Sequence, residues 1–231
     1  MNRCRLLLPV GALVALALIA GSARSGTFAN ISIDDVYTDW VGVPEVVVDA
    51  ADTSTGPDIA TVQVANDNTY LYIRLRYHSA DSFPTYLAID NDSNASTGFN
   101  IFGLGVVGSE AGYADDFDFD QRAGFNIGTL KDPVRPTEPE SGSAALSSFT
   151  ESTDREMAIR LDTTFDPFVG QGDVFPTDSF RLLLYSLDAT FAQADITVPV
   201  QYTLAVPEPG SIVMVLVATA TLLIRRLWHQ Y

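Results

Sequence analysis

Three side chains that carry oxygen stand at alternate positions in one short stretch of the chain: Asp90, Asp92 and Asn94. Oxygens at positions i, i+2 and i+4 of a tight loop converge on one point, as in the first half of an EF-hand loop. Oxygen ligands without histidine or cysteine favour Ca²⁺ over zinc or copper. The stretch therefore predicts either a calcium-binding loop or an Asx-rich turn that holds no metal.

Further oxygens could complete a coordination shell around such an ion. Ser96 and the Thr97-Gly98 pair follow the loop closely, Glu110 is an acid further along the chain, and Asp58 would approach from a facing strand. No glycine occupies the sixth position of an EF-hand loop, and no helix is expected to follow. We therefore expect a cation bound in a loop of a β-rich fold.

A second acidic stretch alternates with phenylalanine. In a strand, Asp116, Asp118 and Asp120 would lie on one face, with Phe117 and Phe119 on the other. The pattern predicts a solvated acidic face above a buried phenylalanine pair. A second cation site on the acidic face is the alternative.

Residues 70–78 alternate cleanly between apolar and polar side chains, which predicts a strand. The apolar face consists of Leu71, Ile73, Leu75 and Tyr77. On the other face, Tyr70 and Tyr72 lie beside Arg74 and form a candidate polysaccharide-binding surface, because sugar C–H faces stack on aromatic rings. An ordinary half-exposed outer face is the alternative.

The positioning elements are expected to be strands throughout the central part of the chain. Further strands are predicted at residues 59–65, 85–89, 99–107, 116–120, 146–150, 156–162, 180–188 and 196–204. Nothing in this part shows a sustained apolar period of 3.6 residues. We therefore predict an all-β protein with a single antiparallel, jelly-roll-like β-sandwich over residues 24–205, and Trp40 packed at its edge.

Signatures of catalysis are sparse. The sequence contains neither a Gly-x-Ser-x-Gly elbow nor a glycine-rich phosphate loop, and His78 is the only histidine of the central domain. A pair of carboxylates could hydrolyse a glycoside, but 29 acids are too many for the sequence to select two. We expect a protein that is not an enzyme, with a glycan-active enzyme as the alternative.

The N-terminus has the pattern of a secretory signal peptide over residues 1–23. Arg3 and Arg5 precede an apolar run, and the small residues Gly21, Ser22 and Ala23 provide a site for signal peptidase. The only cysteine, Cys4, precedes the apolar run. Removal of the signal would therefore leave a chain without disulfides, thiol nucleophiles or cysteine-bound zinc.

The C-terminus carries a matching membrane signal over residues 206–231. The Pro207-Glu208-Pro209 motif comes before a predicted apolar helix at residues 210–224, and Arg225 and Arg226 follow that helix. The helix is marginal against the roughly 20 residues needed to span a bilayer. Basic residues tend to stay in the cytoplasm. The signal helix and this transmembrane helix would therefore flank a domain that lies outside the inner membrane.

This C-terminal arrangement resembles the PEP-CTERM sorting signal. The resemblance implies a Gram-negative bacterium that makes exopolysaccharide, recognition of Pro207, Glu208 and Pro209 by an exosortase, and Arg225 and Arg226 as the stop. It also implies a membrane-anchored precursor that is cleaved near the motif and passes to the cell envelope or extracellular matrix. A plain C-terminal anchor is the alternative.

The central domain resembles the β-sandwiches related to family 9 carbohydrate-binding modules and the DOMON-like group. The matching motifs are Asp34-Asp35, Asp39-Trp40, Gly56-Pro57-Asp58-Ile59, Asn66-Asp67, Tyr70-Leu71-Tyr72-Ile73, Ile89-Asp90-Asn91-Asp92-Ser93-Asn94 and Thr97-Gly98. They cover roughly residues 31–110. The resemblance implies a jelly-roll-like sandwich, often with bound calcium, that binds sugars in some members.

The charge limits the possible partners. The chain has a formal net charge of −16, and Arg3, Arg5, Arg225 and Arg226 lie in the terminal signals. An acidic surface repels nucleic acid and anionic lipid. We therefore expect an exported, non-catalytic protein that contacts polysaccharide and binds calcium, and no nucleic acid as a partner. A structural matrix or adhesion protein without a specific sugar ligand is the alternative.

Overall fold

The computed structural model describes residues 26–53, 55–125, 127–131, 144–148, 150–165 and 170–207. The predicted signal peptide lies outside these residues. So does the sorting signal after Pro207, including Glu208, Pro209, Arg225 and Arg226. Within the described ranges, no helix has the length and apolar character that a membrane crossing requires.

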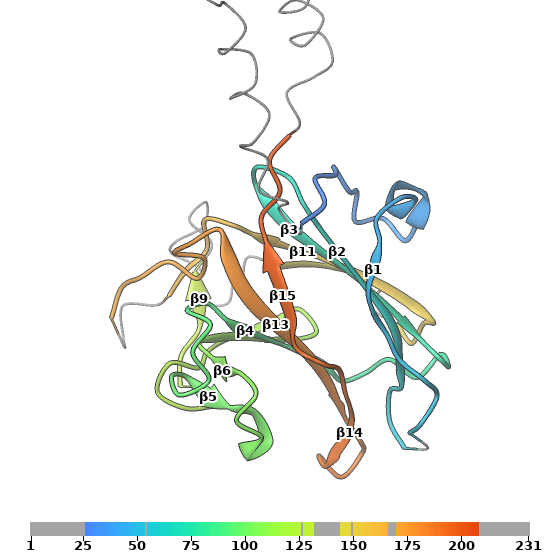
Figure 1. The fold of residues 1–231 in the computed structure, drawn as a ribbon. Helices are drawn as coiled ribbons and strands as arrows, with labels where there is room; N and C mark the ends of the chain where they lie inside the picture. The colour runs from blue at the N-terminus through green and yellow to red at the C-terminus, as the bar shows by residue number, and fades with distance from the viewer. Residues whose placement is uncertain are drawn as a thin grey trace, which may run out of the picture.

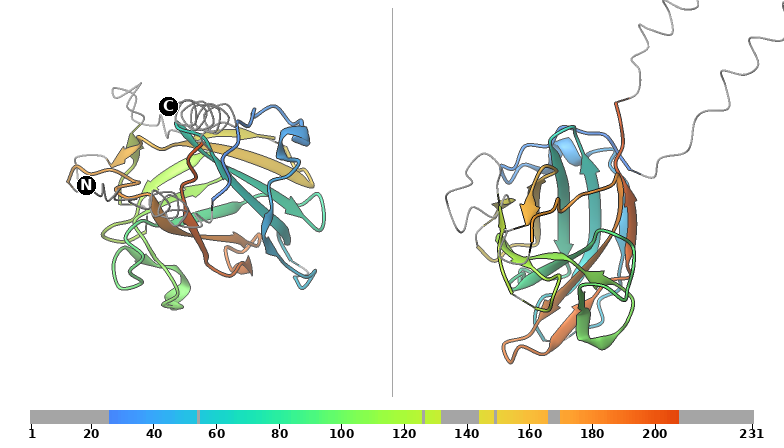
Figure 2. Two further views of the ribbon diagram at one scale, coloured as in Figure 1. Left: turned by 45° about the horizontal axis from the view of Figure 1, so that its top comes forward. Right: turned by 90° about the vertical axis from the view of Figure 1, so that its left-hand side faces the viewer.

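Two antiparallel sheets stacked face to face make up the described domain (Figures 1 and 2). The first sheet has the order β1 (Glu45–Val48), β2 (Ile59–Asn66), β3 (Tyr70–Tyr77), β11 (Asp154–Arg160) and β10 (Ala144–Ser147). The second has the order β14 (Gln193–Ile196), β13 (Ser179–Leu187), β4 (Thr85–Asp90), β7 (Ala111–Ala114) and β8 (Phe117–Asp120), and β15 (Val200–Thr203) also pairs with β13. The prediction of an all-β antiparallel sandwich is confirmed.

Short elements complete the described part. Two small pairs are β5 (Phe99–Asn100) with β6 (Gly108–Ser109) and β9 (Leu130–Lys131) with β12 (Thr164–Phe165). Two short 3₁₀ turns are η2 (Tyr37–Trp40) and η3 (Ile101–Gly103).

Apolar side chains from both sheets meet in one core between them. Alternate positions of β3, such as Leu71 and Ile73, pack in the same cluster as Leu182 and Leu184 of β13. Because side chains alternate along a strand, the residues between them point to the outer faces of the sandwich. The alternation predicted for residues 70–78 is thus confirmed.

The outer face of the first sheet is covered by the segment before β1. Trp40, at the end of η2, is only 1% exposed and packs with Ile31 and Val43 against Tyr72 and Ala158. This small second core follows from chain connectivity, since residues 27–44 fold back across β2, β3 and β11. Trp40 is buried against the sandwich as expected, but it lies on the outer face of the sheet, against Tyr72 and Ala158 of β3 and β11, rather than at the edge.

On the second sheet, the outer face carries a hairpin that we call the flap, comprising residues 99–109 with β5, η3 and β6 (Figure 1). Ile101 and Val107 of the flap pack on Ala88 and Leu183. The prediction of one continuous strand at 99–107 is wrong. The backbone has φ of 48° at Phe102, 71° at Gly103 and 67° at Gly105, values that no strand adopts.

Strand β8 reverses the predicted orientation of its acids. Asp118 and Asp120 are buried, whereas Phe117 is 62% exposed. Asp118 accepts the backbone N–H of Leu130, and Asp120 forms an ion pair with Arg122 at 2.6 Å. Bonds to the loop after the strand therefore turn the acids inward, and the prediction of a solvated acidic face was wrong.

Candidate cation site and aromatic hollow

Three of the predicted metal-ligating residues come together at one end of the flap. Asp90 ends β4, Asp92 lies in the following loop, and Glu110 lies between β6 and β7; their carboxylate oxygens are within 4.8 Å of one another. A backbone hydrogen bond brings Glu110 beside the end of β4: the Glu110 N–H donates to the Ile89 carbonyl at 3.0 Å. We call these three residues the acidic triad.

Asn94 shapes the loop with its backbone. Its N–H donates to Asp90 Oδ1 at 3.0 Å and to Asp92 Oδ1 at 2.9 Å, while its own side-chain oxygen accepts the Ser96 N–H. The Thr97 hydroxyl bonds both oxygens of Asp92 at 3.1 Å. The loop is thus an Asx-type turn, and it presents two carboxylates to a third.

Glu110 has a buried carboxylate oxygen that accepts no hydrogen bond from the described residues. Its side chain is 6% exposed; Oε2 accepts the Asn91 N–H at 3.0 Å, whereas Oε1 has no hydrogen-bond partner in the part of the chain described. Burial raises the pKa of Glu110 to about 7, and the nearby Thr97 hydroxyl and the Asn91 N–H oppose this shift. The Thr97 hydroxyl itself is engaged by Asp92 and the Asn94 carbonyl. A buried carboxylate oxygen without a partner costs about 1–3 kcal/mol. A cation beside Oε1 would remove that cost.

The charge of the site fits a divalent ion. Burial raises the pKa of Asp90, and the Arg181 guanidinium opposes this shift from 3.1 Å. With all carboxyls ionised, three negative charges less one positive charge leave −2. Carboxylate oxygens suit hard cations such as Ca²⁺ and Mg²⁺, and the triad alone does not choose between them.

Asp58, the remaining predicted ligand, lies outside the triad. It is buried immediately before β2, in the other sheet, where its charge influences Asp195. Asp195 accepts the Ile59 N–H at 2.7 Å. The structure thus brings together Asp90, Asp92 and Glu110 and does not add Asp58 to them.

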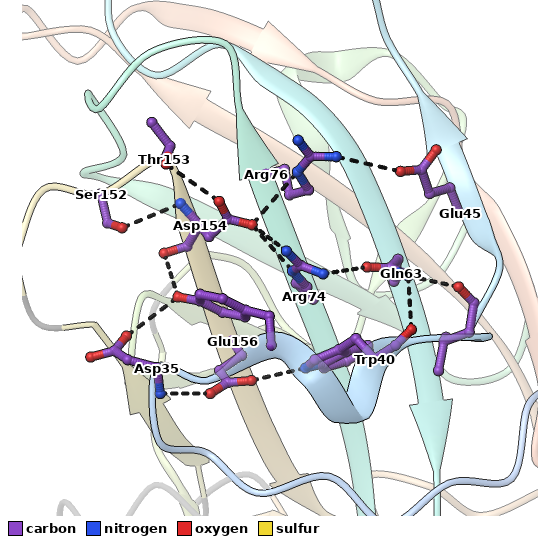
Figure 3. Close-up of polar contacts among 12 residues, drawn as sticks. Asp35, Trp40, Glu45, Gln63, Arg74, Arg76, Ser152, Thr153, Asp154 and Glu156 are labelled. Atoms are coloured by element: carbon purple, nitrogen blue, oxygen red, sulfur yellow. Dashed lines mark hydrogen bonds and ion pairs between the residues drawn. The ribbon is translucent and has the colours of Figure 1, made fainter.

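The predicted tyrosine surface on β3 is covered rather than open. Tyr72 is 4% exposed, and its hydroxyl donates to Asp67 at 2.8 Å. Arg74 bonds Asp154 at 2.6 Å and Gln63 at 3.1 Å (Figure 3). Tyr70 is half-buried against the same cluster. This face therefore does not offer sugar rings the platform that the sequence suggested.

Glu156 attaches the covering segment to the sheet. It accepts the Trp40 indole N–H at 2.8 Å and the Asp35 backbone N–H at 3.0 Å (Figure 3). It also accepts the backbone N–H of Asp34 at 2.8 Å. Burial raises the pKa of Glu156, and the bond from Trp40 opposes that shift. No local pattern in the sequence indicated this role, because Glu156 and Trp40 are far apart in the chain.

An aromatic hollow of about 430 Å³ lies on the outer face of the second sheet. Its lining residues are Tyr86, Phe99, Ile101, Phe102, Phe119, Phe125, Tyr185, Leu187 and Phe191. The Tyr86 and Tyr185 rings stack at 4.9 Å, and Phe102 meets Tyr185 edge-on at 5.2 Å. No pattern in the sequence predicted this hollow. Its only local signal is the recurrence of phenylalanine between residues 99 and 125.

The hollow and the acidic triad lie on the same outer face of the second sheet, at opposite ends of strand β4. Outward positions of β4 are Tyr86, Ala88 and Asp90, and the register pairs Tyr86 with Tyr185 and Asp90 with Arg181. Four residues of strand separate the two sites, which corresponds to about 13 Å. The flap packs on the interval between them. Its first half, with Phe99, Ile101 and Phe102, forms a wall of the hollow, and its returning strand β6 leads directly into Glu110 of the triad.

Comparison with known proteins adds no family: no protein-family model matches this chain, and no curated protein gives a significant match.

Proposed function

We propose that this chain is an exported, non-catalytic β-sandwich protein of the cell envelope or extracellular matrix, which holds Ca²⁺ at the acidic triad and contacts polysaccharide. The observation that carries the proposal is the convergence of Asp90, Asp92 and Glu110 around a buried oxygen without a partner. A jelly-roll-like strand order is part of the same proposal. The sorting motif and the acidic composition support the location outside the cell.

Calcium is favoured over magnesium by the setting of the triad. Ca²⁺ accepts irregular oxygen shells, whereas Mg²⁺ requires nearly ideal octahedral geometry. Ligands from both ends of the segment between β4 and β7 would then be joined by one ion.

Removal of calcium tests the metal site. Free Ca²⁺ at about 100 times its dissociation constant should add about 2.7 kcal/mol to the free energy of unfolding. For a domain of this size the melting temperature should rise by about 5–10 °C. We expect Asp92→Ala and Glu110→Gln to abolish the difference between melting curves recorded with calcium and with chelator.

Asp52→Asn is the matched control, because Asp52 is an exposed acid far along the chain from the triad. It removes the same charge and should keep the full calcium shift. Titration calorimetry should give one site in the wild type. Identical wild-type melting curves with and without chelator would reject the metal site.

Processing of the C-terminus tests the proposed route to the envelope. Glu208 stands at the centre of the Pro-Glu-Pro motif. If an exosortase reads this motif, Glu208→Ala should accumulate as an uncleaved precursor in the membrane fraction, as immunoblots of fractionated cells would show. Normal release of the variant would instead favour a plain C-terminal anchor.

Contact with polysaccharide is tested by binding of the exported protein to polysaccharide extracted from the envelope of the cells that produce it. Retention of the protein on that material supports the proposal. Absence of binding, with calcium present, would favour a structural matrix protein without a sugar ligand.

A further inference from the structure

We propose that the aromatic hollow binds a neutral sugar ring, and that the cation at the acidic triad holds one wall of this hollow in place. The inference rests on the proposed function, and it names the contact site and its regulation. The covered tyrosines of β3 cannot provide that contact, whereas the hollow is open to solvent at Phe102, Phe125 and Phe191.

The lining of the hollow suits the apolar face of a ring. Aromatic rings surround it, and a pocket of this volume is of the size that holds small ligands. The hydroxyls of Tyr86 and Tyr185 form no hydrogen bond with any other described residue. They are therefore free to meet the hydroxyls of a bound sugar, and they would supply the few polar contacts that orient a ligand in an apolar site.

Charge excludes the main competing occupants. A net charge of −16 disfavours an anionic ligand or lipid surface, and also a second copy of the same chain. None of the lining residues is charged, so a cationic ligand would lose its hydration without gaining a carboxylate partner. A neutral ligand remains, and the unbonded hydroxyls of Tyr86 and Tyr185 favour a hydroxylated ring over a purely apolar one.

The flap links the hollow to the triad. Phe99, Ile101 and Phe102, in the first half of the flap, line the hollow. The returning strand is anchored by the Gly108 N–H, which donates to Asp90 Oδ2 at 3.4 Å. Asp90 precedes the flap and Glu110 follows it, so a cation bound by both would close its base. Arg181 adds a bond from its Nη1 to the Val106 carbonyl at 3.3 Å.

A flap that the cation already holds should bind sugar more tightly than a mobile flap. The conformational entropy of the wall is then lost when the cation binds, so sugar binding does not have to order the wall again. Linkage requires the reverse as well: a bound sugar should tighten calcium binding by the same factor. Coupling between such sites is typically about 5–150-fold.

The test measures affinity of the exported protein for the neutral fraction of the producing cells' envelope polysaccharide, by electrophoresis through gels that contain it. We expect Phe102→Ala to weaken binding by about tenfold or more. Phe117→Ala is the matched control, because Phe117 is equally an exposed phenylalanine of this sheet but does not line the hollow. When chelator removes the cation, the affinity of the wild type for the polysaccharide should also fall by about tenfold.

Each outcome separates this inference from the function on which it rests. If the wild type binds calcium and polysaccharide, but Phe102→Ala binds as tightly as Phe117→Ala, only the hollow is refuted. If Phe102 matters but the chelator does not change affinity, the clamp is refuted. Displacement of the polysaccharide by choline chloride would overturn the choice of a neutral sugar. Failure of the wild type to bind any polysaccharide would refute the proposed function itself.

Discussion

Glu156 shows how one side chain can organise a whole segment. It is buried in β11 and accepts three N–H donors from residues that precede β1. A carboxylate suits this position because both of its oxygens accept hydrogen bonds, whereas any other polar side chain of this size has a donor. The orientation of the indole and the path of the chain at residues 34–35 thus depend on one residue.

Replacement of Glu156 by glutamine should therefore be costly despite the similar shape. The amide N–H₂ would face either the Trp40 indole N–H or the backbone N–H groups of Asp34 and Asp35, which would leave buried donors without acceptors. We expect the free energy of unfolding to fall by about 1–3 kcal/mol. Denaturation with urea would measure the change.

Glu45→Gln is the control for this substitution. Glu45 is well exposed, and its nearest cation, Arg76, lies 3.7 Å away. Exposed pairs of this kind contribute about 0–1 kcal/mol. Equal losses in the two variants would contradict the role assigned to Glu156.

Among the elements, the segment before β1 acts as a third layer on the first sheet. Its anchor is Trp40, which closes the small core formed with Ile31, Val43 and Tyr72. The layer occupies the face on which the sequence suggested a sugar surface. Because this segment covers the outer face of the first sheet, that face is not accessible to a ligand.

Trp40→Ala should detach this layer from the sheet. Loss of a buried tryptophan costs about 3–5 kcal/mol, and it also leaves Glu156 Oε2 without its indole donor. We expect a lower melting temperature and faster proteolytic cleavage of the segment before β1. Val41→Ala, at an exposed neighbouring position, should change neither quantity; parallel behaviour of both variants would argue against a docked layer.

Strand positions were predictable where alternation is strong and local. The segments at 59–65, 70–78 and 85–89 all correspond to strands of the sandwich. Strand β7 was not predicted, because Ala111-Gly112-Tyr113-Ala114 has weak strand propensity and is held by pairing with β4 and β8. The flap was mistaken for a strand because its turn depends on backbone angles that apolar periodicity does not encode.

At the scale of the whole molecule, buried carboxylates set the response to pH. Burial raises the pKa of both Glu156 and Asp195 above their ordinary values of 4.5 and 3.8. The folded protein therefore keeps these protons at pH values where the unfolded chain has already released them. Asp162 and Asp188 have lowered pKa values and act in the opposite sense, but both lie in solvent-accessible turns, where screening is strong.

A carboxyl whose pKa is raised by folding stabilises the folded protein fully at pH values below its ordinary pKa. This stabilisation is lost as the pH rises through the pKa of the group in the folded protein. Burial also raises the pKa of Glu110 to about 7, so this group titrates between about pH 5 and pH 8. We therefore expect a higher melting temperature at about pH 5 than at about pH 8 in chelator. Measurement in about 0.5 M salt screens the repulsion among surface acids and retains the effect of burial. A melting temperature that is constant or rises over this interval would contradict the assignment.

Sequence alone determined the properties that depend on neighbouring residues. The period of two in residues 70–78 selected the inner face of β3, and the spacing of Asp90 and Asp92 placed two acids in one tight loop. These predictions succeeded because alternation along a strand and convergence within a tight loop are local geometry.

Tertiary structure alone decided which surfaces are open and which distant side chains meet. Burial of Tyr72 under Trp40 needs the chain before β1 to cross the sheet, and the hollow needs β4, β13 and the flap to lie side by side. Inward acids on β8 likewise depend on the loop that supplies their donors. The physical reason is that burial is a sum over contacts between segments far apart in the chain, which no local period contains.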